Sequence, residues 1–188
     1  MAATISIRKH LRPYRMVDAR KTTINHAFAS ALAIVDDYDE ARVNSGLALL
    51  GVDPENVVCV YCDSPAETWD HLHGLVKNGR FAGRGHQIGN LVPACKPCNS
   101  AKGNSDWRKF AERRGTSPRR IQQIAQYEAL LSEVCDEHRL TERYPDLMRE
   151  YADVREATIE LLRNGDVIAA KIQDAERSRR AEPARIAE

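Results

Sequence analysis

The spacing of apolar side chains predicts an amphipathic helix in the first part of this chain. From Lys21 to Leu50 the apolar residues recur mostly at steps of three and four, and two consecutive aspartates, Asp36 and Asp37, mark a place where the helix can break. Gly51 follows the last apolar residue and predicts the helix end. The chain up to this glycine is therefore predicted to be a helical arm.

The same periodicity returns after residue 116. Ser117-Pro118 combines an N-cap with proline at the first helical position and predicts a helix over 117–134. A second helix is predicted over 145–162, where Asn164-Gly165 ends it, and a last one over 166–180. The apolar residues do not keep a heptad repeat, so no coiled coil is predicted.

The centre of the chain has short segments of β type. Residues 68–72 and 91–92 predict short strands, and the β-branched run 57–61 predicts that the first CxxC lies at a strand end or at a knuckle. The stretch 74–89 contains glycines and basic residues without periodicity, which predicts a loop with a turn at Asn78-Gly79.

Two short helices are predicted after the last of these strands. The first covers 98–102, because Pro97 suits the first turn of a helix and Gly103 ends it. The second covers 107–115, and its aromatic side chains are expected to face the core.

Two CxxC pairs, Cys59-Val-Tyr-Cys62 and Cys95-Lys-Pro-Cys98, lie in this central region. Thiolates two residues apart on a tight turn can bind the same soft cation, and two such turns complete the tetrahedral shell that Zn²⁺ prefers. Ordinary buried or disulfide-bonded cysteines are the alternative, which two matched spacings in a chain with no secretory signal disfavour. The sequence therefore predicts a structural zinc ion bound by Cys59, Cys62, Cys95 and Cys98, and a buried thiol at Cys135.

Together these elements predict an α+β fold, mostly helical overall, with a small zinc-stapled ββα core between helical segments. The predicted parts are an N-terminal helical arm over 1–52, the core over 53–115 and a C-terminal helical region over 116–188. A chain of 188 residues suffices for one small domain with such helical additions. The C-terminal helices are expected to serve as a scaffold or an oligomer contact.

The charge of the chain is small in total but unevenly distributed. The formal net charge is +1, yet residues 71–120 contain eleven Lys and Arg against two acidic residues, and both flanks are net acidic. Neutralising phosphates supplies most non-specific affinity for nucleic acid, so a basic block around the cysteines predicts a polyanion-binding surface. A solvated charged face is the plainer alternative.

The sequence also predicts a soluble, cytoplasmic protein that has no membrane partner. It has no run of about twenty apolar residues, and its basic N-terminus is not followed by an apolar stretch with a cleavage site of small residues. Cysteines held by a metal suit a reducing compartment.

Between the CxxC pairs lie side chains suited to metal-assisted hydrolysis. Asp70 and Asn99 can each supply the oxygen ligand that a hard cation such as Mg²⁺ prefers. His71 could take a proton from water near neutral pH, and the side-chain carbonyl of Asn90 could bond its imidazole N–H and fix the tautomer. A base, a metal and a positioned phosphate would make a phosphodiester hydrolase.

These residues resemble the HNH family of nucleases, also called the ββα-metal fold, over roughly residues 57 to 104. The resemblance rests on the Asp-His pair, the Asn-Leu-Val run, the Cys-x-x-Cys-Asn-x-x-Lys-Gly stretch and the zinc knuckle beside them. It implies that His71 is the general base, that Asp70 and Asn99 bind the catalytic metal and that Asn90 orients the base. The last of these positions is Asn here, where the family name has His, a change that is common in the family.

The resemblance implies a metal-dependent endonuclease that cleaves DNA, most simply double-stranded DNA, to 5′-phosphate and 3′-hydroxyl ends. Its cofactors would be Mg²⁺ or another divalent cation for catalysis and Zn²⁺ for structure. A double-strand cutter with one active site per chain would most simply act as a homodimer.

The insertion between His71 and Asn90 adds candidate contacts to DNA. Its basic side chains could clamp the scissile phosphate or the neighbouring backbone, although a simple surface loop is a nearly equal alternative. His73 should point to the same side of a strand as His71, where it could touch metal or phosphate or serve as a structural partner. The candidate phosphate or DNA contacts are His73, Lys77, Arg80, Arg84, His86 and Lys102.

Three classes of function stay open. The leading one is an endonuclease of restriction type or of a phage or mobile element. A non-catalytic zinc module that binds nucleic acid would keep the cysteines and the basic block, but would not require Asp70, His71, Asn90 and Asn99 together. A structural or protein-interaction protein with a degenerate core is the third, and the intact set disfavours it.

Overall fold

The structure is a computed structural model that describes residue 7 and residues 10–131 and 134–181. The outer ends of the predicted helical regions (1–6, 8–9 and 182–188) and residues 132–133 of the predicted helix 117–134 lie outside the described residues. The chain divides into two compact units. One is Phe28–Pro145, and the other joins Met1–Ala27 to Asp146–Glu188.

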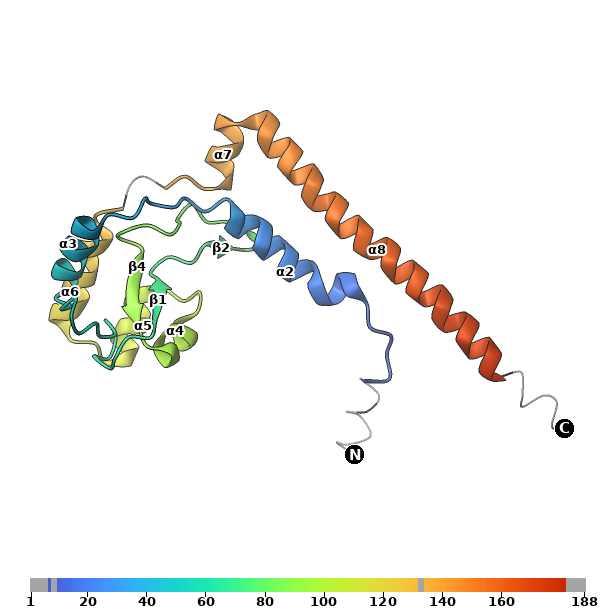
Figure 1. Ribbon diagram of the computed structural model, residues 1–188, viewed down its shortest axis with the longest axis horizontal. Helices are drawn as coiled ribbons and strands as arrows, with labels where there is room; N and C mark the ends of the chain where they lie inside the picture. Colours follow the sequence, from blue (N-terminus) through green and yellow to red (C-terminus); the bar gives the residue numbers. More distant parts are fainter. Residues whose placement is uncertain (1–6, 8–9, 132–133, 182–188) are drawn as a thin grey trace. The chain divides into compact units, whose positions relative to one another are not determined.

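The predicted fold class, α+β and mostly helical, is confirmed (Figure 1). The helices are α2 (Met16–Ala31), α3 (Glu40–Leu50), α4 (Lys96–Lys102), α5 (Trp107–Arg114), α6 (Pro118–Glu128), α7 (Glu137–Arg143) and α8 (Pro145–Ala181). The strands are β1 (Thr68–His71), β2 (Val76–Lys77), β3 (Arg80–Phe81) and β4 (Leu91–Ala94).

The first predicted helix is broken at the two aspartates, as the sequence indicated. Helix α2 ends before them, and α3 begins after Asp39, whose carboxylate accepts a hydrogen bond from Arg42 N at 2.9 Å and caps the helix. Asp36 accepts a hydrogen bond from Ile88 N at 3.0 Å, so its side chain ties the linking segment to the core. Gly51, at a φ of 64°, ends α3.

The two central strands form the ββα element together with α4 (Figure 1). Strands β1 and β4 are antiparallel, with Asp70 opposite Val92 and His71 opposite Leu91. Of the two alternatives for 57–61, a strand end or a knuckle, the structure has the knuckle. This segment contributes only an isolated bridge, between Val58 and Pro65, because the backbone turns tightly at Cys59, whose carbonyl accepts hydrogen bonds from the next residues of the CxxC turn.

The predicted loop over 74–89 contains a small hairpin of β2 and β3. Its turn is at Asn78-Gly79, as predicted, with φ values of 54° and 75°. Two consecutive residues with positive φ define the hairpin turn that Asn-Gly favours.

One hydrophobic core joins the ββα element to α3, α5 and α6. The Tyr61 ring packs edge-on against Phe110, with 5.1 Å between the ring centroids, and Ile124 of α6 is fully buried. Ser117 caps α6 through a hydrogen bond from Arg120 N at 3.2 Å, as predicted, but the helix ends at Glu128 instead of reaching residue 134. Helix α7 was not predicted.

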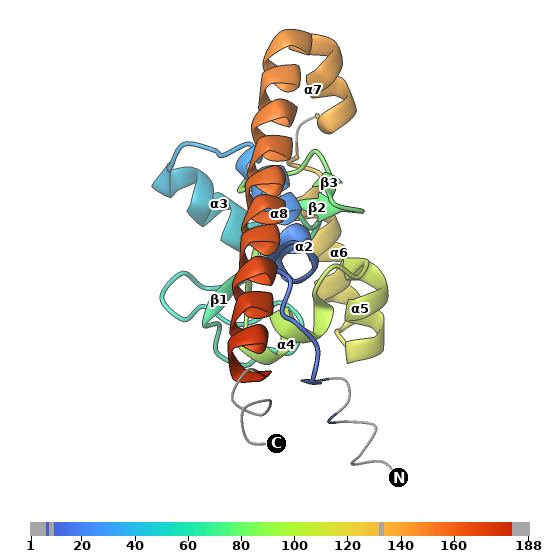
Figure 2. The same ribbon diagram turned by 90° about the vertical axis from the view of Figure 1, so that its right-hand side faces the viewer.

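The C-terminal helix contradicts the predicted break at Asn164-Gly165. Helix α8 is continuous through these residues (Figure 2). Asp166 caps a different helix, because its carboxylate accepts hydrogen bonds from Met16 N at 2.7 Å and Val17 N at 3.2 Å at the start of α2. A Cβ at position 165 would lie 2.5 Å from the Met16 side chain, so the glycine allows close packing there. Among the described helices, none combines the length and hydropathy needed to cross a membrane.

Candidate active site and metal centre

The four cysteines of the CxxC pairs converge on one point. Their sulfur atoms all lie within 4.8 Å of one another. Cys62 Sγ is 3.7 Å from Cys95 Sγ and 3.6 Å from Cys98 Sγ. A zinc ion with four tetrahedral bonds of about 2.3 Å would separate its sulfurs by about 3.8 Å. The four cysteines are therefore positioned to bind a metal ion.

The surroundings of this cluster suit a bound cation. Burial raises the pKa of Cys59 to about 12, so a positive charge is needed to keep this sulfur as the thiolate that a metal binds. Arg114 of α5 donates from Nε to Cys98 Sγ at 3.4 Å, which offsets part of the negative charge that four thiolates bring. Cys135 lies outside the cluster and is half-buried.

The alternation of side chains along β1 separates the two residues of the Asp-His pair. Asp70 points into the core and is 3% exposed, whereas Trp69 and His71 lie on the other face. This arrangement gives the aspartate and the histidine different surroundings.

Asp70 belongs to a buried polar network. It accepts a hydrogen bond from Tyr61 Oη at 2.7 Å and pairs with Lys102 Nζ at 3.2 Å. Burial raises the pKa of Asp70, although Lys102 and the Tyr61 hydroxyl favour its charged form. Each carboxylate oxygen thus has a protein partner, and binding of a metal by Asp70 stays a prediction.

Lys102 has a different position from that expected of a DNA contact. Its side chain is 1% exposed, and besides Asp70 its ammonium donates to the carbonyls of His71 at 2.6 Å and Gly103 at 3.3 Å. All three donors of this ammonium are therefore used inside the fold. Lys102 ties α4 to the end of β1, next to the histidine.

Asn90 is fully buried, and its amide clamps the backbone of the insertion. Its Oδ1 accepts from His73 N at 2.8 Å, and its Nδ2 donates to the carbonyls of His73 at 3.1 Å and Gly85 at 2.9 Å. The amide thus holds the segment 73–85 at both of its ends, at His73 and at Gly85. The predicted bond from Asn90 to the imidazole of His71 is not among these contacts.

His71 is half-buried, and its partner is another histidine. Its Nε2 lies 3.1 Å from His86 Nδ1, and the tautomers of the two rings decide which of these nitrogens donates the hydrogen bond. Burial, with smaller contributions from His86 and Lys102, lowers the pKa of His71 to about 4. The imidazole is therefore neutral at pH 7, with a nitrogen lone pair that can accept a proton.

Asn99 of α4 lies against the outer part of β1. Its Nδ2 donates to Thr68 Oγ1 at 3.3 Å and to the Trp69 carbonyl at 3.4 Å. Because the amide nitrogen is used on the strand, the amide oxygen is the atom that can offer a lone pair to a hard cation.

The other predicted contacts divide between structural and exposed positions. His73 Nε2 bonds Glu128 Oε1 at 2.6 Å, and Trp107 Nε1 donates to the same carboxylate oxygen at 3.3 Å, which makes His73 a link to α6. Lys77, Arg80 and His86 are exposed, and Arg84 is half-buried.

The structure brings His71, His86 and Asn99 to β1 and its neighbours, and directs Asp70 and Lys102 into the core. Sequence reasoning missed Tyr61, Arg114 and Glu128, which hold the site residues in position. Each of the three lies outside the sequence motif that contains its partner, so these contacts are seen only in the folded structure.

Comparison with known proteins supports the resemblance. The chain matches the family of HNH endonucleases over residues 59–105. This segment contains both CxxC pairs, the ββα element and the insertion with His86. The curated proteins and the solved structures compared with this chain gave no match. The part of the chain that contains the candidate site is thus the part that is similar to HNH endonucleases.

Proposed function

We propose that this protein is a metal-dependent DNA endonuclease in which His71 activates the attacking water. The observation that carries the proposal is the state of His71: a half-buried, neutral imidazole at the end of β1, with Nε2 bonded to His86. His71 Nδ1 accepts a proton from water in the tautomer in which Nε2–H donates to His86 Nδ1.

The chain's own residues divide the chemistry as follows. His71 takes one proton from a water molecule as its oxygen attacks the phosphorus, and the bond from phosphorus to the 3′-oxygen breaks. The products carry 5′-phosphate and 3′-hydroxyl ends once the leaving oxygen has taken a proton from solvent. Lys102 and Asn90 position this histidine by holding the backbone that follows its side chain, at the His71 carbonyl and at His73 N.

We assign the catalytic divalent cation, Mg²⁺ or a similar ion, to Asn99 and Asp70. When bound, such an ion supplies positive charge against the phosphate oxygens. The oxygen chemistry of the pair fits a hard cation. Lys102 and Tyr61 hold the Asp70 carboxylate in a fixed direction.

We assign Zn²⁺ to the four cysteines. Four thiolates close the tetrahedral shell and leave no position for water or substrate, so this ion serves folding. The exposed Lys77 and Arg80, on the hairpin of β2 and β3, are proposed to contact the DNA backbone.

Replacing His86 by alanine is expected to lower the cleavage rate by about 10- to 100-fold, the range found when a hydrogen-bonded partner of a site residue is removed. His86 both fixes the ring of His71 and lowers its pKa, so the variant should also lose activity at a higher pH than the native protein does. The measurement is a profile of the cleavage rate against pH. His86→Gln, which keeps a hydrogen-bonding group, should retain more of the rate, and an unshifted acid limb in His86→Ala would contradict this role.

The biological role is proposed to be that of a restriction-type enzyme or of a phage or mobile-element nuclease, in the cytoplasm. We propose helical parts over 1–52 and 116–188 around a core over 53–115, and a homodimer if both DNA strands are cut. The alternative, a zinc module that only binds nucleic acid, would bind DNA without cutting it.

Digestion of plasmid and genomic DNA of known methylation with Mg²⁺ or Mn²⁺ tests this proposal. Discrete bands are expected from a site-specific enzyme and a smear from a non-specific one. Intact DNA in every digest, together with measurable DNA binding, would favour the alternative.

A further inference from the structure

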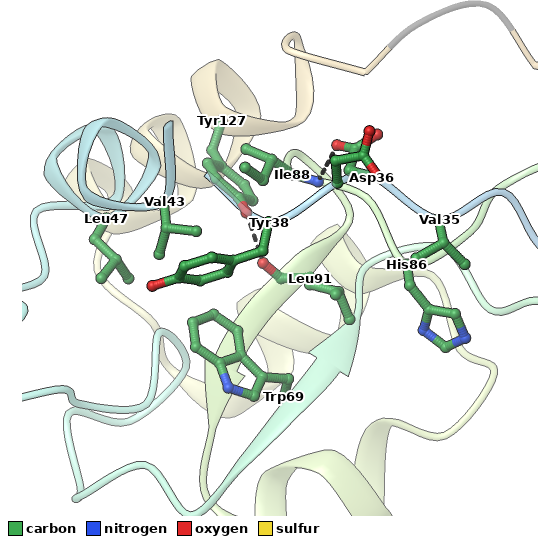
Figure 3. A pocket seen from close by; sticks show the side chains of 11 residues that line it. Val35, Asp36, Tyr38, Val43, Leu47, Trp69, His86, Ile88, Leu91 and Tyr127 are labelled. Atoms are coloured by element: carbon green, nitrogen blue, oxygen red, sulfur yellow. Dashed lines mark hydrogen bonds between the residues drawn. The ribbon is translucent and has the colours of Figure 1, made fainter. Parts of the chain in front are cut away.

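A cavity of about 400 Å³ lies next to His86 and is not used by the proposed chemistry. Pockets that bind small ligands commonly have about 300 to 1,000 Å³. His86, the hydrogen-bonded partner of His71, lines one part of it, and the rings of Tyr38 and Trp69 line another (Figure 3). One residue of the candidate active site, His86, is therefore also part of the cavity wall.

Trp69 is an exposed aromatic side chain next to the Asp-His pair. It is 47% exposed and lies on the same face of β1 as His71, two residues away. Two residues of a strand span about 6.6 Å. A base next to the phosphate at His71 would thus come close to the indole ring.

Tyr38 faces the same cavity from the segment between α2 and α3, and it is 82% exposed. This segment is fixed against the insertion, since His86 N donates to the Ile34 carbonyl at 2.8 Å and Asp36 N donates to the His86 carbonyl at 3.1 Å. A Cβ at Gly85 would lie 1.8 Å from the Ile34 carbonyl oxygen. The close approach that forms this wall of the cavity therefore requires glycine.

The charge of the cavity favours a base over a phosphate. Asp36 and Asp37 both line it. Asp36 Oδ2 is already bonded to Ile88 N and paired with Arg42 at 3.5 Å, which leaves Asp37 as the carboxylate that repels phosphate and can accept a hydrogen bond from the amino group of a base. The remaining lining is mainly apolar and aromatic, with Val43 and Leu47 near the Tyr38 ring (Figure 3). Flat aromatic ligands stack on such side chains.

We propose that this cavity takes one unpaired nucleobase of the DNA strand that is cut, stacked on Trp69 and Tyr38. The inference rests on the proposed DNA endonuclease function and specifies its substrate. A base is extruded from a duplex most readily where it is mismatched, damaged or already single-stranded. DNA with such a base beside the cleaved phosphate is therefore the preferred substrate.

A fluorescence titration tests this inference with the full chain and no added divalent cation. The probes are three oligonucleotide duplexes: one with a single unpaired base, one with an abasic residue at the same position and one fully paired. The unpaired base should bind about ten-fold more tightly than the abasic residue and should quench tryptophan emission. Trp69→Phe, which keeps an aromatic ring and leaves Trp107 as the one tryptophan, should retain most of the affinity and lose the quenching.

Trp69→Ala and Tyr38→Ala should each weaken binding of the unpaired base by about 5- to 100-fold and leave binding of the paired duplex unchanged. Tyr38 is so exposed that its removal does not disturb the core. Equal affinity for the base-bearing and abasic duplexes would overturn the inference. It would also be overturned if the protein formed a dimer that Trp69→Ala dissociates without any change in base preference, because the cavity would then contact a second copy of the chain. If the native protein cuts plasmid DNA but shows no base preference, only the inference fails; if it prefers the unpaired base but cuts no DNA, only the proposed nuclease function fails.

Discussion

Replacing His71 by alanine is expected to abolish DNA cleavage, with the rate falling by at least about 100- to 10,000-fold, the contribution of a general base. The substitution removes the group that takes the proton from water, while the buried bonds of Asp70 and Asn90 stay in place. The fold should survive, because His71 is half-buried and the hydrogen bond described for its ring is to His86, an exposed residue.

The measurement is the initial rate of nicking of supercoiled plasmid in Mg²⁺, with DNA binding and metal content measured on the same samples. His138→Ala is the matched control, since this histidine is exposed and pairs only with Glu142 of its own helix among the ion pairs of the described residues. It should cut at the native rate. Normal nicking by His71→Ala would show that another group is the base.

Replacing Cys95 by serine is expected to release the metal from the cysteine cluster and unfold the core around it. Structural zinc in small domains contributes about 10 to 16 kcal/mol of binding free energy, which is as large as the whole stability of a typical domain, about 5 to 15 kcal/mol. Cys95 lies at the N-cap position of α4, where its side chain makes no cap hydrogen bond, and it is 6% exposed, so its replacement removes a buried metal ligand at the start of the helix that holds Asn99.

Metal content by elemental analysis and the emission of Trp107 report this change. Trp107 is 3% exposed in the core, and its emission should move to longer wavelength on unfolding. Cys135→Ser is the control, because this cysteine lies outside the cluster and should keep the metal and the native emission. A Cys95→Ser protein with native metal content would contradict a four-cysteine site.

The features predicted correctly from the sequence depend on near neighbours in the chain. Paired spacing shows that Cys59 and Cys62 can share a metal, and the turn at Asn78-Gly79 follows from the backbone freedom of those two residues. The helix cap at Ser117 is equally local, because its side chain bonds the backbone three residues on. Such signals are complete within a few residues.

The features that the sequence did not reveal depend on partners far along the chain. Gly165 and Asp166 read as a helix end followed by a cap, but Asp166 caps α2, 149 and 150 residues earlier in the chain. Lys102 was predicted to contact phosphate or DNA, but its ammonium pairs with Asp70 inside the core. In each case the local pattern was identified, and its partner was set by tertiary packing.

The contact between His71 and His86 likewise depends on residues that are far apart along the chain. His86 lies in an insertion without periodicity, and nothing in its immediate sequence connects it with His71. The backbone contacts of Asn90 and the close approach at Gly85 bring the two rings together. Asn90 thus acts on the histidines through the backbone, a different role from the direct bond to the imidazole that was expected.

The chemistry of the product ends tests whether this chain hydrolyses DNA at an HNH site. Plasmid nicked by the native protein in Mg²⁺ would be incubated with DNA ligase, before and after treatment with phosphatase. We expect nicks that ligase seals directly and that phosphatase makes unsealable, because each nick would carry a 5′-phosphate and a 3′-hydroxyl. Plasmid that stays supercoiled, or nicks that ligase cannot seal, would contradict the proposed hydrolysis.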